Sequence, residues 1–206
     1  MTNVYPGLVH LNGNMLAAVD VETTGRVPGY HEIIQIAVVP LTHHLEPNDD
    51  IRPFYYEIKP EHKERAEKEA QTIHGIDLNR LVREAPDKWE VAEWFDEWWQ
   101  KLKLPFRKTL VPLAQNWQFE AGFLKDWLGV ESFHQFFHPY ARDTMLTAIH
   151  YNDKAVMHGL PIPFKLVGLP YLCKLLGVVN TKPHDALADS IAEAAIYKKL
   201  LEMDLA

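Results

Sequence analysis

An apolar run that ends in two closely spaced acids and a glycine constrains this chain more than any other stretch. Leu16 to Val21 is short, compatible with β-structure and followed at once by turn residues, which predicts a buried strand. Side chains alternate between the two faces of a strand, so Asp20 and Glu22 are expected to point the same way. Two carboxylates held together at the end of a buried strand repel each other and lose hydration, and a divalent cation is the usual compensation. By itself the spacing is equally compatible with an acidic strand end in solvent.

Length and composition indicate a single globular domain. The chain has 206 residues, of which 47% are hydrophobic and 24% charged, and these values are typical of a folded protein rather than a disordered one. The formal net charge of −7 argues against broad electrostatic capture of nucleic acid, although it leaves room for a local basic groove. One cysteine, Cys173, excludes an intrachain disulfide and suits a reducing compartment. The first 14 residues carry neither a signal-peptide pattern nor a long apolar run, so we expect a cytoplasmic protein with no membrane association.

The order of predicted elements indicates an α/β domain with a mixed central β-sheet flanked by helices. Residues 33–39 and 54–58 are rich in β-forming residues and predict an antiparallel meander with the first strand, joined by a polar loop at 42–53. The remaining predictions are helices at 60–71, 87–102, 118–128, 145–151, 166–176 and 186–201, a strand at 110–114 and a loop at 152–164. The tryptophans of 87–102 recur at helical spacing, so we expect them to face the core rather than to stack on bases.

Two further acids lie beside predicted helix starts, far from the first pair in sequence. Glu120 falls in the first turn of one helix, and Asp189 lies one turn into an alanine-rich helix whose small side chains permit close packing on a sheet. Sites in α/β proteins gather where strand ends meet helix starts, so the four acids are expected to converge. Taken singly, each of these two is also explained as an acid favoured by the helix dipole, and His74 before Gly75 as a helix-capping residue.

Three segments, taken together, resemble the exonuclease motifs of the DEDD superfamily in order and spacing. They are Asp20-Val21-Glu22-Thr23-Thr24-Gly25, then Asn116-x-x-Phe119-Glu120-x-x-Phe123-Leu124, then His184-x-Ala186-x-x-Asp189. The histidine five residues before the last aspartate is similar to the DEDDh branch, which includes the proofreading subunits of bacterial replicative polymerases. Ile73-His74-Gly75-Ile76 followed by Ala85-Pro86, and Asp143-Thr144 before a helix, also match. The resemblance runs from about Leu16 to Leu201 and implies a ribonuclease H-like fold in a single exonuclease domain over residues 1–206, with its core at about 15–201.

The resemblance implies a metal-dependent 3′–5′ exonuclease that releases nucleoside 5′-monophosphates. Two Mg²⁺ or Mn²⁺ ions would be held by Asp20, Glu22, Glu120 and Asp189. Oxygen ligands favour these hard cations over zinc. His184 would take the proton of the attacking water as general base.

The resemblance also implies a site for the terminal nucleotide of a single-stranded nucleic acid 3′ end. The residues it assigns to that site are Thr23, Thr24, His74 and Phe119. Such contacts reach stacking faces and backbone, so little sequence preference is expected. Analogy with proofreading subunits favours DNA slightly over RNA and adds a polymerase or a homodimer partner as candidate protein partners.

The chain departs from the family at the second motif, where the family has aspartate and this sequence has Glu120. The extra methylene moves the carboxylate by more than about 1 Å unless the helix shifts, and misplacement on that scale can cost about 10²-fold in rate. The longer arm could equally replace a water-mediated contact by a direct one. Three functions therefore remain open: an active exonuclease, a weakened exonuclease-like module that binds 3′ ends or docks on a polymerase, and a phosphodiesterase acting on small nucleotides.

Overall fold

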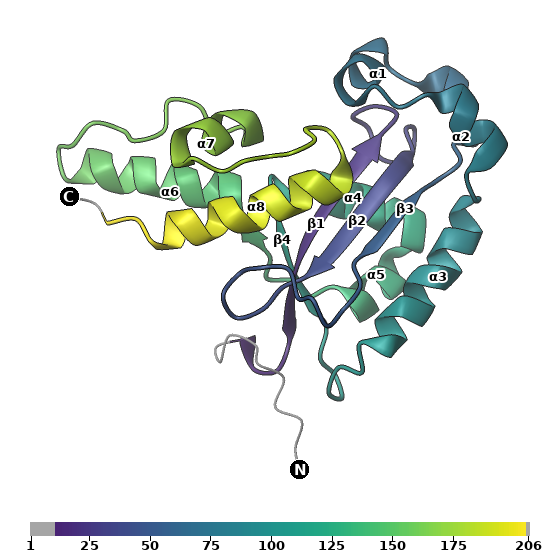
Figure 1. Ribbon diagram of the computed structural model, residues 1–206, viewed down its shortest axis with the longest axis horizontal. Helices are drawn as coiled ribbons and strands as arrows, with labels where there is room; N and C mark the ends of the chain where they lie inside the picture. The colour runs from purple at the N-terminus through teal and green to yellow at the C-terminus, as the bar shows by residue number, and fades with distance from the viewer. Residues whose placement is uncertain (1–10, 205–206) are drawn as a thin grey trace.

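The computed structural model describes residues 11–204, which fold around a five-stranded sheet with helices on both faces (Figure 1). The strands are β1 (Met15–Thr23), β2 (Ile33–Pro40), β3 (Phe54–Glu57), β4 (Leu110–Ala114) and β5 (Arg142–Asp143). Their order in the sheet is β3-β2-β1-β4-β5, with β1 to β3 an antiparallel meander and β4 parallel to both β1 and β5. The predicted α/β class with a mixed sheet is confirmed. Residues 1–10, on which the expectation about a signal peptide partly depends, lie outside the described residues.

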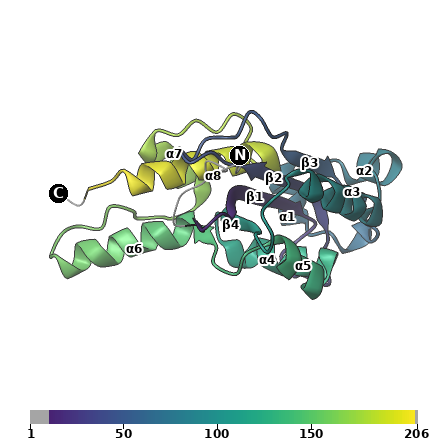
Figure 2. The same cartoon turned by 90° about the horizontal axis from the view of Figure 1, so that it is seen from below.

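Eight α-helices surround the sheet in the described part of the chain. They are α1 (Lys68–His74), α2 (Leu78–Glu84), α3 (Lys88–Lys101), α4 (Trp117–Leu128), α5 (Val130–Phe136), α6 (Thr144–Met157), α7 (Leu169–Leu176) and α8 (Ala186–Leu201). Figure 2 shows α4 and α5 on one side of the sheet and α8 on the other. None of the helices within residues 11–204 combines the length and the apolar character needed to cross a membrane.

The alternation of side chains along β1 separates two hydrophobic cores. One core contains Ala17, Val19 and Val21 with Phe95 of α3 and Phe123 of α4. The other contains Leu16 and Ala18 with Ala194 and Tyr197 of α8. Because Asp20 and Glu22 continue the second series, β1 directs both carboxylates to the side of the sheet that α8 covers. The predicted orientation of this pair therefore follows from the pleat of the strand.

The helix predicted over 60–71 begins later than expected. The chain runs irregularly from residue 60, with a short 3₁₀ turn at Lys63–Arg65, and α1 starts only at Lys68. The carboxylate of Glu32 accepts hydrogen bonds from the backbone N–H groups of Glu61 and His62, at 3.0 and 2.8 Å. These tertiary bonds satisfy the backbone by a different route from helix formation, which explains why the local propensity did not prevail.

The α3 helix buries a narrower stripe than the sequence predicts. Val91 and Phe95, four residues apart, are fully buried, whereas the side chain of Trp89 is 62% exposed. Two residues correspond to about 200° around a helix, so Trp89 lies opposite Val91. Trp94 is also exposed at the edge, where its ring lies 5.2 Å from that of Tyr56. The expectation that all the tryptophans face the core is therefore wrong for Trp89 and Trp94.

Two further helices differ in their boundaries from the sequence prediction, and two helices were not predicted. The helix α6 continues to Met157, into the predicted loop, and α7 starts at Leu169 rather than 166. The sequence prediction contains neither α2 nor α5, each of which has seven residues. Helices of this length carry only two turns of periodic pattern, so their stability depends on tertiary packing, with Leu81 and Phe133 as buried anchors.

Candidate active site

A cavity of about 390 Å³ lies where the end of β1 meets α4 and α8. Its walls include all five residues that the sequence assigns to catalysis: Asp20, Glu22, Glu120, His184 and Asp189. No lysine or arginine is among the described residues that line it. The structure therefore concentrates acidic groups in one cavity without a positively charged side chain to balance them.

The two acids of β1 enter the cavity side by side. Burial, followed by the charge of Glu22, raises the pKa of Asp20 well above its ordinary value, and its Oδ2 is buried without a hydrogen-bond partner in residues 11–204. Burial, then Asp189 and Asp185, raise the pKa of Glu22 to about 8. The physical cause is the same for both acids, because lost hydration and neighbouring negative charge both disfavour ionisation.

Asp189 reaches the cavity from the first turn of α8. Its Oδ1 accepts a hydrogen bond from the side chain of Asn180, and its Oδ2 accepts one from the backbone N–H of His184 at 3.1 Å. Burial raises the pKa of Asp189 although both hydrogen bonds oppose the shift. One ligand atom each from Glu22, His184 and Asp189 lie within 4.8 Å of one another, which is close enough for the three to share a metal ion.

Glu120 reaches the same cavity from α4, on the other side of β1. Its side chain is 3% exposed, and its Oε2 has no hydrogen-bond partner in the described part of the chain. Burial and the charge of Asp20 raise its pKa. The start of α4 is fixed by the carboxylate of Asp143, which accepts hydrogen bonds from the backbone N–H groups of Asn116 and Trp117, at 3.3 and 2.8 Å. Asp143 thereby sets the direction in which Glu120 points.

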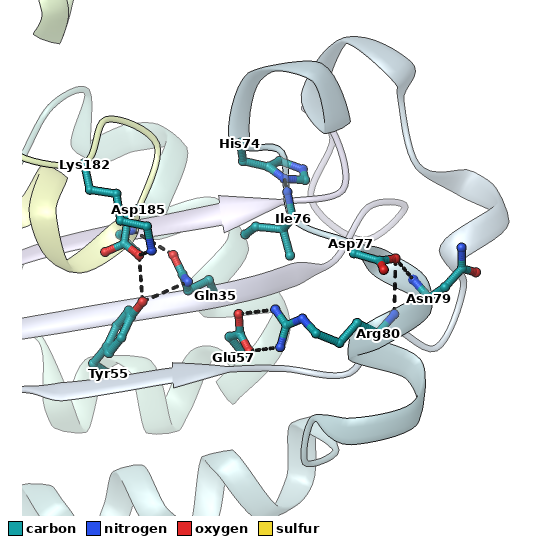
Figure 3. Close-up of polar contacts among 11 residues, drawn as sticks. Gln35, Tyr55, Glu57, His74, Ile76, Asp77, Asn79, Arg80, Lys182 and Asp185 are labelled. Atoms are coloured by element: carbon teal, nitrogen blue, oxygen red, sulfur yellow. Dashed lines mark hydrogen bonds and ion pairs between the residues drawn. The ribbon is translucent and has the colours of Figure 1, made fainter.

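His184 lies on the loop before α8. Figure 3 shows that Asp185 of this loop contacts Tyr55 of β3, which in turn contacts Gln35 of β2. The next residue, Asp185, accepts a hydrogen bond from the hydroxyl of Tyr55 at 2.7 Å, and that hydroxyl accepts one from Gln35 at 3.0 Å. The side-chain oxygen of Gln35 in turn accepts from the backbone N–H of Ala186 at 2.8 Å. His184 itself adopts a left-handed backbone with φ of 64°, which is uncommon for a residue with a Cβ atom. These hydrogen bonds stabilise the backbone of the loop on which His184 lies.

A second, smaller pocket of about 210 Å³ adjoins the acidic cavity. The two share Val21, Glu22 and Phe119, and the pocket also includes Thr23 and His74. Thr24, assigned with them by the sequence, does not line it.

Thr24 is fully buried within the turn that follows β1. Its hydroxyl accepts a hydrogen bond from the backbone N–H of Glu32 at 2.9 Å, and its own N–H donates to the carbonyl of Glu32. The adjacent Gly25 leaves no room for a side chain, because a Cβ atom there would lie 2.5 Å from the ring of His31. Thr24 therefore stabilises the rim of the pocket.

The sequence left two roles open for His74, a helix-capping residue or a residue of the nucleotide pocket. In the structure His74 lies at the end of α1 and also lines the smaller pocket. Its Nδ1 accepts a hydrogen bond from the backbone N–H of Ile76 at 2.9 Å (Figure 3). Burial, with a smaller effect from His184, lowers the pKa of His74, so the neutral ring carries its proton on Nε2. That nitrogen is buried and has no partner within residues 11–204, which leaves a hydrogen-bond donor unused beside the pocket.

Sequence reasoning missed one buried acid in the cavity, Glu193. Its side chain is 0% exposed and lines the same walls as the predicted acids. Burial, then Asp20 and Glu120, raise its pKa well above its ordinary value. The available signal was its position four residues after Asp189, which places both carboxylates on one side of α8.

Several solved structures share this fold at low sequence identity. Cell-death related nuclease 4 (CRN-4) aligns with a TM-score of 0.68 and 20% identity over 92% of this chain and 64% of its own. The nuclease domain of 3′hExo, a DEDDh family member bound to rAMP, aligns with a TM-score of 0.64 and 20% identity over 92% of each chain. E. coli exonuclease I in complex with a dA16 oligonucleotide aligns with a TM-score of 0.67 and 19% identity, over 91% of this chain and 40% of that one. The chain thus spans less than two thirds of CRN-4 and of exonuclease I.

The sequence comparisons agree with the structural ones at the level of the family. No curated protein shows a significant sequence match to the chain. The profile of the RNase_T family, described as exonuclease, matches residues 17–197, a range that contains all three motifs. The expectation of a ribonuclease H-like exonuclease fold is confirmed, and the chain belongs to the RNase_T exonuclease family, with the motifs of its DEDDh branch except for Glu120 in the second motif.

Proposed function

We propose that this protein is a metal-dependent exonuclease that hydrolyses the phosphodiester bond at the 3′ end of single-stranded nucleic acid and releases nucleoside 5′-monophosphates. DNA is slightly favoured over RNA. The single observation that carries the proposal is the cavity that Asp20, Glu22, Glu120 and Asp189 line together with His184. Each acid taken alone could be explained by its structural position. The presence of all four in one buried cavity indicates a chemical role instead.

The residues present fit a pair of divalent cations. Two buried carboxylate oxygens, Asp20 Oδ2 and Glu120 Oε2, lack hydrogen-bond partners in the described part of the chain. A set of carboxylate oxygens is the donor set that Mg²⁺ and Mn²⁺ prefer. Asp20, Glu22, Glu120 and Asp189 are the residues that would hold them, and two such ions supply activation of the attacking water and stabilisation of the charge on the phosphate.

His184 is the residue proposed to take the proton of the attacking water, at a ring nitrogen. Its imidazole lies beside Glu22 and Asp189, and the N–H···O bond to Asp189 fixes its main chain. The hydrogen bonds from Tyr55 to Asp185 and from Ala186 to Gln35 fix the residues that follow. A general base must be held within hydrogen-bond reach of the proton it accepts, and the neutral imidazole is the form that accepts it.

The smaller pocket is proposed to take the terminal nucleoside. Phe119 offers an aromatic surface, Thr23 is the last residue of β1, and His74 Nε2 offers a free donor for a sugar or phosphate oxygen. Arg26 also lines this pocket, where its guanidinium forms ion pairs with Glu67 and Glu69 at 3.4 and 2.5 Å. None of these groups is arranged to distinguish bases by their edges, which supports a substrate of any sequence.

A weakened module that binds 3′ ends is the second candidate, and the specific observation that favours it is Glu120 in the position of the family's aspartate. A polymerase or a second copy of this chain would be its partner. For either candidate we propose a cytoplasmic location, which the free, buried Cys173 suits.

The test incubates a 5′-labelled oligonucleotide, as DNA and as RNA, with the protein and Mg²⁺ or Mn²⁺. A ladder of shortened products that requires the metal and disappears with Asp20→Asn supports the enzyme. The matched control is Asp153→Asn, an exposed aspartate on α6, which should leave the ladder unchanged. Binding without shortening supports the weakened module instead, and turnover restricted to dinucleotides identifies a small-nucleotide phosphodiesterase.

A further inference from the structure

A groove of about 620 Å³ lies at the edge of the sheet, where β3 faces α3. Its walls include five aromatic residues: Phe54, Tyr55 and Tyr56 of β3, and Trp94 and Trp98 of α3. The side chains of Tyr56 and Trp94 are 37% and 36% exposed, and their ring centroids lie 5.2 Å apart. Within residues 11–204, β3 is the outermost strand on this side of the sheet (Figure 1). Both rings are therefore partly accessible to a ligand from solvent.

The groove carries more positive than negative charge, in a protein whose net charge is −7. Arg52 and Lys101 line it and are exposed, and the carbonyl of Arg52 accepts a hydrogen bond from Trp98 Nε1 at 2.8 Å. The one acid in its walls, Glu97, lies 3.8 Å from Lys101 Nζ. The chain then continues through residues 101–108, which hold four basic residues and no acid: Lys101, Lys103, Arg107 and Lys108. A local basic surface of this kind attracts a polyanion even when the whole protein is acidic.

The groove and the acidic cavity meet at the start of α8. Leu187 lines the groove, whereas His184 and Asp189 line the cavity. The hydroxyl of Tyr55, in the wall of the groove, donates to Asp185 at 2.7 Å, and Asp185 directly follows His184 (Figure 3). The loop before α8 and the first turn of that helix therefore form the boundary between the two. A strand whose 3′ end lies in the cavity has the groove within reach of its preceding nucleotides.

The combination of rings and basic groups favours nucleic acid as the occupant. Single strands are bound without sequence preference where bases stack on aromatic rings and phosphates lie near arginine or lysine. An apolar peptide would use the rings but not the charge of Arg52. Two copies of this chain paired at β3 would place a surface with excess positive charge against itself.

We propose that this groove binds the nucleotides that precede the 3′ end of a single strand held in the acidic cavity. The assignment rests on the proposed function, which places the 3′ end there. Tyr56 and Trp94 provide the stacking surface, and Arg52 pairs with a phosphate. The groove adds affinity only for strands long enough to reach it, so it makes the enzyme selective for strands over dinucleotides.

The test measures binding of the full chain to a 5′-labelled dT strand of about 20 nucleotides, which exceeds the usual site size. Phosphorothioate linkages at its 3′ end resist hydrolysis, and fluorescence anisotropy in Mg²⁺ reports the affinity. Trp94→Ala should weaken binding about 5–100-fold, because stacking on one ring contributes that much per base. The matched control is Trp89→Ala, an exposed tryptophan of α3 outside the groove, which should bind like the wild type.

A salt titration tests the charge separately. Arg52→Gln should reduce the slope of log affinity against log salt concentration by about 0.7, the value for one phosphate contact on a single strand. Arg83→Gln, an exposed arginine on α2, should leave that slope unchanged. Trp94→Ala and Arg52→Gln should both hydrolyse a dinucleotide at the wild-type rate, because a dinucleotide does not reach the groove.

Wild-type affinity of Trp94→Ala for the long strand overturns the proposal, and so does an unchanged slope in Arg52→Gln. In both cases the proposed function stands if the wild type still shortens an unmodified strand. A wild type that neither binds nor shortens a strand would overturn both. Equal losses on strand and dinucleotide would assign these residues a structural role and contradict the proposal.

Sedimentation of the same variants separates the groove from an interface between two copies. A wild-type dimer that becomes a monomer in Trp94→Ala would identify the groove as that interface and refute strand binding there. If Trp94→Ala melts too low to be measured, Trp94→Leu replaces it, because leucine keeps apolar packing against Tyr56 but offers no ring. Wild-type affinity of that variant for the long strand would count equally against the proposal.

Discussion

Glu22 should make the metal-free protein less stable as the pH rises from about 6 to 8. Burial, Asp189 and Asp185 raise its pKa from 4.5 to about 8 in the folded state. Between about pH 6 and pH 8 the folded protein binds more protons than the unfolded chain, so the free energy of unfolding falls as pH increases. At about pH 6 the folded carboxyl group binds nearly one proton and at about pH 8 half of one, while the unfolded group binds almost none.

The size of the effect follows from the same titration. Between about pH 6 and pH 8, Glu22 alone should lower the free energy of unfolding by no more than about 2 kcal/mol. For a chain of this length that corresponds to roughly 4–8 °C in melting temperature. Metal binding requires the ionised carboxylate, so stabilisation by Mn²⁺ should grow over the same range, in which the metal-free protein weakens.

The assay is a thermal melt monitored by fluorescence, at intervals between about pH 6 and pH 8, in EDTA and in Mn²⁺. Glu22→Gln does not titrate, so its melting temperature in EDTA should fall less with pH than that of the wild type. Comparison of the two proteins cancels the contributions of the histidines, and Glu97→Gln controls for the loss of an exposed glutamate. Equal pH slopes for wild type and Glu22→Gln in EDTA would refute the reasoning.

Three further substitutions test the site. Glu120→Asp should lower the rate of nucleotide release by about 10²-fold at unchanged stability, because the shorter side chain withdraws the carboxylate from the cavity. A rate at or above that of the wild type would contradict this prediction. His184→Ala should lose about 10²–10⁴-fold in rate while Mn²⁺ titration shows unchanged affinity, and an unchanged rate would remove its role as base. Tyr55→Phe leaves the buried side-chain amide N–H of Gln35 without its acceptor and removes one of the donors to Asp185, so it should cost about 1–3 kcal/mol in chemical denaturation and lower kcat more than KM changes. An unaltered kcat would show that this contact does not position His184.

The sequence by itself predicted four of the five strands of the sheet, all except the two-residue β5. The apolar run before Asp20, the β-rich stretches that follow it and the strand at 110–114 all formed as predicted, because alternation along a strand is a local property of the chain. The same alternation determined that Asp20 and Glu22 share a face. The motif spacing identified the family, since Glu120, His184 and Asp189 occur at recognisable intervals.

Element boundaries depended on tertiary contacts and were predicted less well. The start of α1 was displaced by the carboxylate of Glu32, which lies about thirty residues earlier in the chain. The exposure of Trp89 followed from which side of α3 meets the sheet. The hydrophobic periodicity of residues 60–71 and of α3 predicts neither effect, because the residues that cause it are distant in sequence.

Only the tertiary structure decided how the individual oxygens of the site are used. Thr24 belongs to a motif, yet its hydroxyl is occupied by the backbone of Glu32, whereas Glu193 belongs to none and lines the cavity. Asp20, Glu120 and Glu193 each keep one buried oxygen without a partner in the described residues because β1, α4 and α8 meet at this point and supply no donor to it. The pattern along a chain fixes which face a side chain occupies, but the partners it finds there depend on elements that only folding brings together.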